Sequence, residues 1–129
     1  MTQQKEITVL IADDESHIRL LLKTIIKSMK ARVIGEAQNG QEAVEKFKAL
    51  NPHITLLDIN MPVKDGLTAL QEIKSAFPNA FVIMMTSVAD LETVKRCLDQ
   101  GASHYIRKDT PIEEMKRMIK DAWVEYRKK

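Results

Sequence analysis

The stretch Ile54-Thr55-Leu56-Leu57-Asp58-Ile59-Asn60-Met61-Pro62 decides the fold. Its first four residues are apolar or β-branched, which predicts a short strand buried on both faces of a parallel sheet. Asp58 follows at the point where this strand emerges, and Pro62 cannot continue a central strand. Because open α/β sheets bind ligands at the carboxyl ends of their strands, we take Asp58 as the expected chemical centre.

The bulk composition indicates an ordinary globular protein. The length of 129 residues suits a single domain, 1–129, and the chain is 44% hydrophobic and 29% charged. No apolar run approaches the roughly 18 residues of a membrane span, and the N-terminus lacks a signal-peptide pattern. Cys97 is the only cysteine, which excludes a disulfide framework. A net charge of +2 is too small to indicate nucleic-acid binding, so we expect a cytoplasmic protein.

Five apolar runs alternate with five stretches in which apolar residues recur at helical spacing. The expected strands are residues 7–12, 33–37, 54–57, 80–85 and 102–106. The apolar faces of the expected helices cover residues 18–29, 43–50, 67–77, 91–98 and 112–126. This alternation predicts an α/β fold with a single doubly wound five-stranded parallel sheet in the order 2-1-3-4-5, as in flavodoxin-like folds.

Capping patterns predict where several helices and turns begin. Asp14 or Ser16 is expected to cap the first helix, and Asn39-Gly40-Gln41-Glu42 has the spacing of a capping box. Thr110-Pro111-Ile112-Glu113 predicts a second capping box, with proline at the first helical position. Lys64-Asp65-Gly66 is expected to form a turn. Gly101 is expected just past the fourth helix.

Acidic residues follow two strands that should lie side by side. Asp13 and Asp14 end the first apolar run, and Asp58 ends the third, so the switch point of the sheet brings them together. Such carboxylates repel one another and raise one another's pKa unless a cation neutralises them, and a set of oxygen ligands suits Mg²⁺. Each acid also has a plainer interpretation. Asp13 and Asp14 are typical helix caps, and Asp58 is a typical loop acid that bonds its own backbone.

Two further polar residues are expected at the same edge of the sheet. Thr86 follows the fourth strand, and Lys108 follows the fifth. Taken alone, they are an ordinary strand residue and an ordinary surface cation. Together they supply a hydroxyl and an ammonium group beside a metal-bound carboxylate, which suits phosphoryl transfer onto Asp58.

These motifs resemble the receiver domain of two-component response regulators, including the chemotaxis regulators. The resemblance covers essentially the whole chain. It implies that Asp58 accepts a phosphoryl group from a histidine kinase or a phosphotransfer protein. It also implies that Asp14, Asp58 and the backbone carbonyl of Asn60 bind Mg²⁺ directly, and that Asp13 acts through water. The motifs that carry it are Asp13-Asp14, Asp58-x-x-Met61-Pro62-x-x-Asp65-Gly66, Thr86-Ser87, Gly101-Ala102-x-x-Tyr105 and Lys108.

The same resemblance implies a switch and an output surface. Thr86 and Lys108 would contact the phosphoryl group, and Tyr105 would turn inward when Thr86 moves. A target protein would bind the face formed by residues 91–98, 102–106 and 112–126. The plainer interpretation of Tyr105 is an ordinary aromatic residue of an edge strand. We expect a signalling domain that catalyses only its own phosphorylation and dephosphorylation, as a monomer or a weak phosphorylation-dependent dimer, without direct contact to nucleic acid or membrane.

Two positions depart from the common pattern of the family. Many receivers carry proline after the lysine, often with a cis peptide bond, but Asp109 follows Lys108 here. A cis bond before a non-proline residue costs about 3 kcal/mol, so we expect a trans bond. The Lys-Asp pair is common in receivers fused to a helix-turn-helix domain, so the alternative is an excised receiver of a DNA-binding transcriptional regulator. Val88 stands where the chemotaxis regulator carries an acid, at a position that influences hydrolysis of the acyl phosphate.

Three other classes of protein fit less well. Hydrolases of the haloacid dehalogenase type carry Asp-x-Asp after the first strand, whereas this chain has Asp13-Asp14. A passive adaptor would not need the complete set of acids, Thr86 and Lys108. Nucleotide-binding folds are disfavoured because neither G-x-G-x-x-G nor G-x-x-x-x-G-K-[ST] occurs. The remaining candidate ligands are scattered and are interpreted as surface or structural residues: His17, His53, His104 and Cys97.

Overall fold

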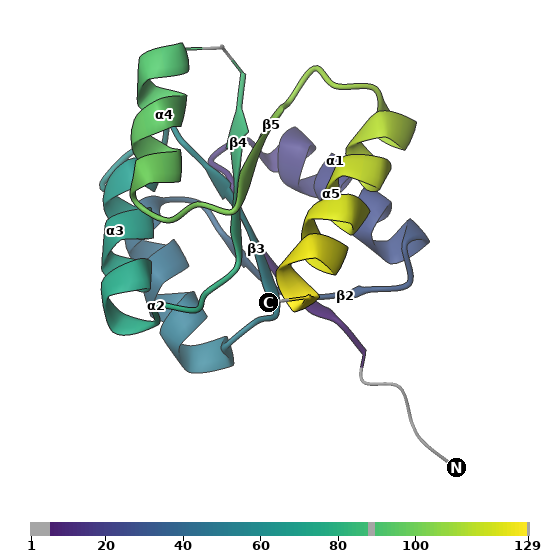
Figure 1. Cartoon of the computed structure of the whole chain (residues 1–129), viewed down its shortest axis with the longest axis horizontal. Coiled ribbons are helices and arrows are strands. Elements are labelled where there is room, and N and C mark those ends of the chain that lie inside the picture. The colour runs from purple at the N-terminus through teal and green to yellow at the C-terminus, as the bar shows by residue number, and fades with distance from the viewer. Residues whose placement is uncertain (1–5, 88–89, 129) are drawn as a thin grey trace.

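The computed structural model describes residues 6–87 and 90–128, which form a parallel sheet between two layers of helices (Figure 1). The strand order β2-β1-β3-β4-β5 confirms the predicted doubly wound α/β fold. Among the described residues, no helix combines the length and the apolar character needed to cross a membrane. The strands are β1 Thr8–Ala12, β2 Arg32–Ala37, β3 Ile54–Asp58, β4 Val82–Thr86 and β5 His104–Arg107. The helices are α1 Ser16–Ser28, α2 Gly40–Leu50, α3 Gly66–Ala76, α4 Leu91–Asp99 and α5 Ile112–Arg127.

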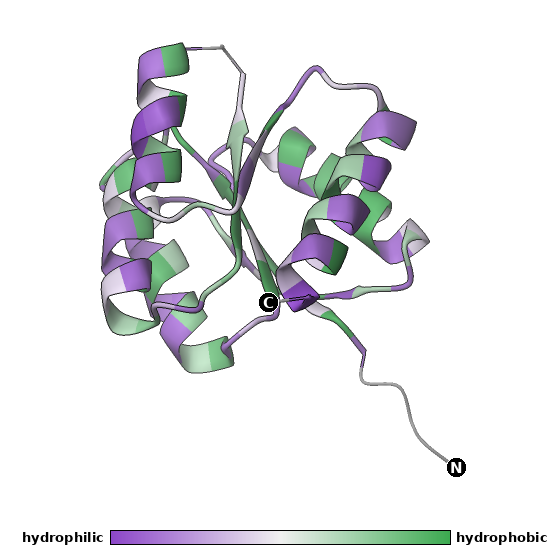
Figure 2. Cartoon of the chain, viewed as in Figure 1, coloured by the Kyte–Doolittle hydropathy of each residue, from purple (hydrophilic) through white to green (hydrophobic). Residues whose placement is uncertain are grey.

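The sheet is covered on both faces, and successive strand residues face opposite layers. In β1, Val9 and Ile11 pack with the apolar residues of α1 and α5, whereas Leu10 and Ala12 pack with those of α2, α3 and α4. The hydrophobic sides of the helices turn toward the sheet (Figure 2). The two central strands β3 and β4 are buried along their whole length. This burial explains why their sequences are continuous apolar runs rather than alternating ones.

The ends of three strands lie slightly beyond the predicted positions. Parallel pairing joins Asp58 to Met85 and Thr86 to Arg107, so Asp58 and Thr86 belong to the ladder. The fourth and fifth strands also begin later than expected, at Val82 and His104. The apolar pattern could not reveal this shift because pairing with a neighbouring strand, rather than hydrophobicity, decides where a strand ends. As a consequence, pairing with the neighbouring strand fixes the backbone of both Asp58 and Thr86.

The start of α1 differs from the prediction. Glu15 occupies the N-cap position without a side-chain hydrogen bond, so the predicted cap by Asp14 or Ser16 is wrong. The Asp13 side chain instead accepts a hydrogen bond from the Glu15 backbone N–H at 2.9 Å. Neither Asp13 nor Asp14 is therefore the N-cap of α1, and Asp14 is exposed.

Other helix ends give mixed results. Asn39 accepts a hydrogen bond from the backbone N–H of Glu42 at 2.9 Å, which confirms Asn39 as the N-cap of α2. The Glu42 side chain accepts from the Gln38 N–H at 3.0 Å instead of the Asn39 N–H, so the reciprocal half of the predicted capping box is displaced by one residue. Gly101 has a φ of 103° just past the C-cap of α4, as predicted. Pro111 is the N-cap of α5, without a side-chain hydrogen bond, so the second predicted capping box is wrong. Ile112 rather than Pro111 is the first helical residue.

The loop between β3 and α3 turns earlier than predicted. The Lys64 backbone N–H donates to the Pro62 carbonyl at 2.7 Å, which forms a tight turn centred on Val63. Val63 has a φ of 69°, in the left-handed region that β-branched residues rarely adopt, and its side chain is 83% exposed. Asp65 is the N-cap of α3 rather than a turn residue. The strained backbone thus lies a few residues after Asp58, in the loop that borders the carboxyl edge of the sheet.

Candidate functional site

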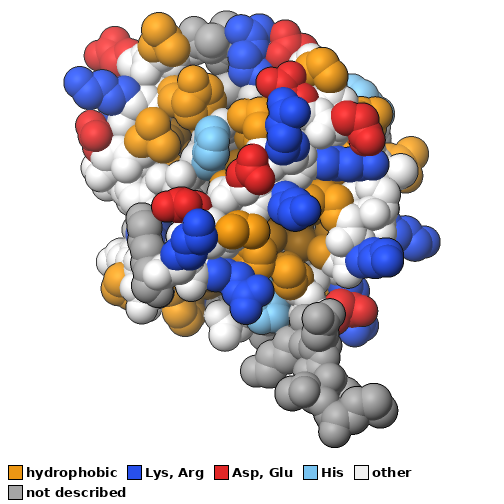
Figure 3. Space-filling model, turned by 45° about the vertical axis from the view of Figure 1, so that its right-hand side comes forward, with side chains coloured by type: hydrophobic (Ala, Val, Ile, Leu, Met, Phe, Trp, Pro, Cys, Tyr) orange, Lys and Arg blue, Asp and Glu red, His pale blue; other side chains and the backbone are white. Residues whose placement is uncertain are grey.

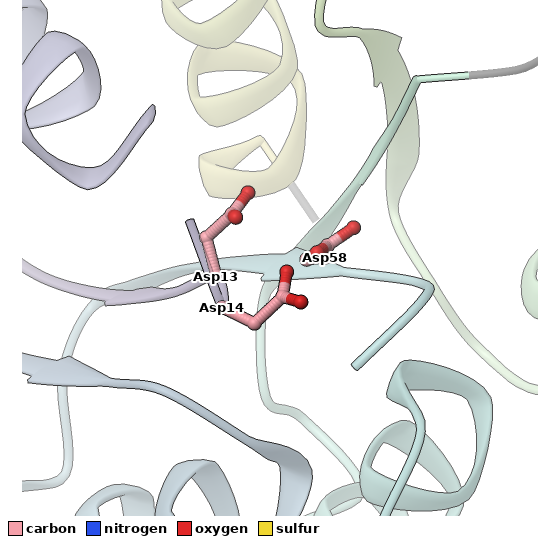
Figure 4. Close-up of side chains that lie close together, drawn as sticks. All are labelled: Asp13, Asp14 and Asp58. Atoms are coloured by element: carbon pink, nitrogen blue, oxygen red, sulfur yellow. The ribbon is translucent and has the colours of Figure 1, made fainter. Parts of the chain in front are cut away.

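Three carboxylates converge at the carboxyl edge of the sheet. Asp13 and Asp14 follow β1, Asp58 ends the adjacent strand β3, and one oxygen of each lies within 4.8 Å of the others. Figure 4 shows the three side chains gathered at the ends of these strands. Asp13 and Asp58 are buried, whereas Asp14 is exposed. The predicted meeting of the acids at the switch point of the sheet is confirmed.

Lys108 supplies a buried positive charge to this cluster. Its Nζ lies 2.7 Å from Asp13 Oδ2 and 3.2 Å from Asp58 Oδ1, and its side chain is only 8% exposed. The Lys108 backbone N–H donates to the Thr86 carbonyl at 2.7 Å, which fixes the lysine against the end of β4. The ammonium group therefore does not reach out into solvent as a surface lysine would. It is the countercharge of a buried carboxylate pair.

Burial and neighbouring charges shift the pKa values of Asp58 and Lys108. Burial raises the pKa of Asp58, the charge of Asp13 raises it further, and Lys108 opposes both effects, leaving the pKa at about 6. Burial alone would lower the pKa of Lys108, but the Asp13 and Asp58 carboxylates prevail and raise it above its ordinary value. Asp58 is thus largely ionised at neutral pH and Lys108 is fully protonated. Keeping the Asp13 and Asp58 carboxylates ionised in this buried pocket costs free energy, and a bound cation would reduce that cost.

Asp13 and Asp14 differ in how much of each carboxylate is already engaged. Asp13 Oδ1 accepts from the Glu15 N–H, its Oδ2 faces Lys108 Nζ at 2.7 Å, and Arg19 Nη1 donates to its backbone carbonyl at 2.8 Å. No hydrogen bond or ion pair within residues 6–87 and 90–128 engages the Asp14 carboxylate. Asp14 is therefore the acid most open to an incoming ligand, and Asp13 is held by the protein itself.

The donor set of the pocket fits a hard divalent cation. The oxygens of Asp13, Asp14 and Asp58 form a cluster that contains no histidine or cysteine among the described residues. Carboxylate oxygens with room for water are typical ligands of Mg²⁺ rather than Zn²⁺. The Asn60 backbone N–H donates to Asp58 Oδ1 at 3.3 Å, which turns this segment toward the pocket. Coordination by the Asn60 carbonyl stays a prediction.

A glycine allows the β3–α3 loop to lie directly on the backbone of Asp58. A Cβ atom at Gly66 would come within 2.0 Å of the Asp58 carbonyl oxygen, a distance that no side chain tolerates. The Gly66 N–H also donates to the Ile59 carbonyl at 2.7 Å. Gly40 has a similar role, because its N–H donates to the Lys64 carbonyl at 2.9 Å and its Cβ would overlap that group. These two contacts fix the loop beside the pocket.

Thr86 and Tyr105 lie on adjacent strands of the sheet. Thr86 is 2% exposed at the end of β4, and Tyr105 pairs in register with Met84 of the same strand. Tyr105 lies half-buried against the core cluster shared by α2, α3 and α4. The edge position of β5, which the sequence predicted, is confirmed. Thr86 and Tyr105 therefore lie on neighbouring paired strands.

Some features of the pocket were missed or misjudged from the sequence. Glu15 Oε1 lies 3.6 Å from Lys108 Nζ, although the sequence pointed only to Asp13 and Asp14. The signal available was the continuation of the acidic run into the next residue. Asp109 turns away from the pocket and accepts two hydrogen bonds from Arg107, at 3.0 and 2.8 Å. Its peptide bond is trans, as predicted, since the described residues contain no cis bond. Val88, the other departure, lies outside the described residues.

Comparison with known proteins identifies the family. The family model described as Response regulator receiver domain matches residues 9–120. The chain belongs to this family. It is 42% identical over 100 residues to chemotaxis protein CheY of Thermotoga maritima, covering 78% of this chain and 83% of that protein. It is also 36% identical over 114 residues to the transcriptional regulatory protein LnrK of Bacillus subtilis, 88% of this chain, and spans only 52% of that longer protein.

Solved receiver structures have the same architecture. CheY in the CheX-CheY-BeF3-Mg²⁺ complex from Borrelia burgdorferi superposes with a TM-score of 0.86 at 34% identity, over 91% of this chain and 89% of that one. A CheY-like receiver domain protein from Methanospirillum hungatei gives a TM-score of 0.88 at 27% identity, over 96% of this chain and 98% of that one. Receiver domains are the signalling domains of two-component systems, and the acidic pocket fits that assignment.

The raised pKa of Asp58 predicts that the free energy of unfolding of the metal-free protein falls as the pH rises. A native pKa of about 6 against 3.8 in the unfolded chain means that the native state binds the proton more tightly. The stability contributed by Asp58 is therefore present at low pH and is lost as the pH rises through about 6. Asp58→Asn stays neutral and escapes this loss. The variant should become more stable than the wild type, by on the order of 2 kcal/mol, as the pH rises.

Urea denaturation in a chelating buffer between about pH 4 and pH 7, which spans the unfolded and native pKa values, measures this difference. Asp109→Asn is the matched control, because Asp109 is exposed and paired with Arg107 outside the pocket. If the difference in the free energy of unfolding between Asp58→Asn and the wild type did not change with pH, the electrostatic description of the site would be wrong.

Proposed function

We propose that Asp58 accepts a phosphoryl group from a histidine kinase or phosphotransfer protein, and that residues 1–129 act as one cytoplasmic receiver module. One observation carries the proposal. A buried carboxylate ends the central strand, with Lys108 Nζ at 3.2 Å and two further acids beside it. Membership in the receiver family supports this interpretation of the cluster. Helix capping or a loop hydrogen bond alone would not need a buried lysine.

The chemistry follows from these groups. An ionised Asp58 oxygen attacks the phosphorus of a phosphohistidine, so that a P–O bond forms while the P–N bond breaks and the imidazole leaves with the bonding electrons. Lys108 neutralises a phosphoryl oxygen, and the Thr86 hydroxyl donates to another. The pKa of about 6 keeps Asp58 ionised at neutral pH. The chain would catalyse only its own phosphorylation and the later hydrolysis of the acyl phosphate.

The residues of the pocket would hold a magnesium ion during this reaction. Asp14 and Asp58 would bind it directly with the Asn60 carbonyl, while Asp13 would act through water because both of its oxygens already face protein groups. The cation supplies charge neutralisation for the phosphoryl oxygens. The relative from Borrelia burgdorferi was solved in a complex with Mg²⁺ and BeF3, which supports the same ion here.

The output surface would be the face of α4, β5 and α5. Leu91 and Leu98 of α4 are 70% and 41% exposed, and Ile112 of α5 is 47% exposed, which offers apolar contacts to a target protein. When Thr86 turns toward the phosphoryl group, Tyr105 would move inward and change this face. Such a shift requires a difference in interaction energy between the two states, which the new phosphoryl acceptor supplies.

The proposed function also includes an oligomeric state and a choice between a receiver alone and a receiver cut from a longer regulator. The favoured form is a receiver that works as a monomer or a weak phosphorylation-dependent dimer. The chain spans about half of LnrK, so an excised receiver of a DNA-binding regulator is the alternative. The pocket chemistry is the same in both. A hydrolase of the haloacid dehalogenase type is rejected if the chain does not cleave small phosphate esters.

Phosphorylation of Asp58 predicts a single added phosphoryl group. Incubation with Mg²⁺ and acetyl phosphate, followed by intact mass measurement, should show one phosphoryl mass on the wild type and none on Asp58→Asn. Asp109→Asn serves as the control, because it removes a nearby acid outside the pocket and should be modified like the wild type. Equal mass gain in Asp58→Asn would show that another residue is the acceptor.

The switch predicts that a change at the pocket reaches Tyr105. Amide chemical shifts recorded with and without Mg²⁺ and beryllium fluoride, a phosphoryl mimic, should move at Tyr105 and Arg107 as well as around Asp58. In Thr86→Ala the pocket signals should still move, while those of Tyr105 should respond much less. If Tyr105 stays silent in the wild type while the pocket responds, the output runs through another face.

A further inference from the structure

A groove of about 580 Å³ lies between α1 and α5 at the amino-terminal end of the sheet. The apolar lining that forms its floor combines the half-buried side chains of Met29, at the C-cap of α1, and Trp123 of α5. Beneath them lie the buried side chains of Ile26, Ile54 and Ile119. Figure 3 shows hydrophobic side chains in a hollow on this side of the molecule, framed by lysine and arginine. The indole N–H of Trp123 is buried without an acceptor among the described residues.

The rim of the groove is strongly basic. Lys30, Lys116, Arg117 and Lys120 line it, with Asp121 as the opposing acid. Lys116 pairs with Glu113 at 3.1 Å, but within the described part of the chain no ion pair engages Lys30, Arg117 or Lys120. An apolar floor inside a cationic rim selects a ligand that is apolar at its centre and negatively charged at its edges.

We propose that this groove binds an acidic amphipathic segment of a partner protein. Apolar side chains from one face of the segment fill the floor, and its flanking aspartate or glutamate residues pair with Arg117 and Lys120. This arrangement is the common mode in which an amphipathic segment lies in a hydrophobic groove.

Charge and shape favour this occupant over two others. A second copy of the chain joined by a twofold axis would place the basic rim against itself, because such an interface uses the same patch on both subunits. An anionic membrane would meet the cations but leave the hollow floor unfilled, since a lipid surface contacts protruding rather than recessed side chains. An acidic segment of protein satisfies both the floor and the rim.

The groove is independent of the phosphorylation pocket. Ile54 begins β3 and Asp58 ends it, so the two sites lie about 13 Å apart along the strand, at opposite ends of the sheet. None of Thr86, Tyr105 and α4 lines the groove. The groove shares only α5 with the proposed output face, and it uses residues 116–123 of that helix rather than Ile112. The partner therefore binds equally well to the phosphorylated and unphosphorylated chain, and acts as a tether rather than as an output.

Trp123, the single tryptophan of the chain, reports binding directly. The probe is an amphipathic peptide of about 15 residues with leucines at helical spacing and glutamates elsewhere. Its titration should change the tryptophan fluorescence saturably, and added salt should weaken it. Arg117→Glu/Lys120→Glu should weaken it at least about tenfold. The matched double reversal Lys48→Glu/Lys95→Glu, on exposed positions of α2 and α4, should bind like the wild type.

Several results would overturn the proposal. These are equal affinity in wild type and Arg117→Glu/Lys120→Glu, equal binding of a peptide with lysines in place of glutamates, and preference for phosphatidylserine vesicles over the peptide. Self-association that the rim variant abolishes, seen by sedimentation, would assign the groove to a second copy instead. Beryllium fluoride with Mg²⁺ should leave the peptide affinity unchanged. This readout separates the groove from the phosphorylation site, because Asp58→Asn should also bind the peptide normally.

Discussion

The repulsion between buried carboxylates is the constraint on which the site depends. Parallel strands β1 and β3 bring Asp13, Asp14 and Asp58 within 4.8 Å of one another, at an edge where two of them have lost contact with water. Lys108 compensates part of this charge, and the hydrogen bond from its backbone to Thr86 holds it there. Burial, followed by the charge of Asp13, keeps the pKa of Asp58 raised despite a lysine at 3.2 Å. The surplus of negative charge favours a divalent cation in the pocket, and that cation together with Lys108 would neutralise an incoming phosphoryl group.

The architecture and the meeting of the acids could be predicted from the sequence, because both follow from local patterns. Apolar runs locate the strands, alternation with helices makes the sheet parallel, and the switch point joins the ends of the first and third strands. The details that failed depend on contacts between distant segments. Glu15 approaches Lys108 only because the fold brings the side chain that follows β5 to the acids that follow β1. Pro111 became an N-cap, and the ladder continued through Asp58 and Thr86, for reasons of backbone geometry that residue type does not reveal.

The acidic pocket and the basic groove lie at opposite ends of the sheet. The acidic pocket and the strained turn at Val63 lie at the carboxyl edge of the sheet, where backbone strain and buried charge are tolerated because the core beneath is closely packed. The basic groove between α1 and α5 lies at the opposite end. Family membership accounts for the acidic pocket, whereas we infer the role of the groove from its own side chains. A receiver with two independent contacts would bring its partner to the pocket without blocking phosphoryl transfer.

The central claim is that the acid cluster is a cation site in which Asp14 is a direct ligand and Asp13 is an indirect one. Melting temperature measured against magnesium concentration tests it most directly, because a ligand that binds only the native state raises the melting temperature by mass action. Wild type and Asp109→Asn should show the same saturable rise, Asp13→Asn should keep part of it, and Asp14→Asn should lose nearly all of it. A full magnesium-dependent rise in Asp14→Asn would contradict the account.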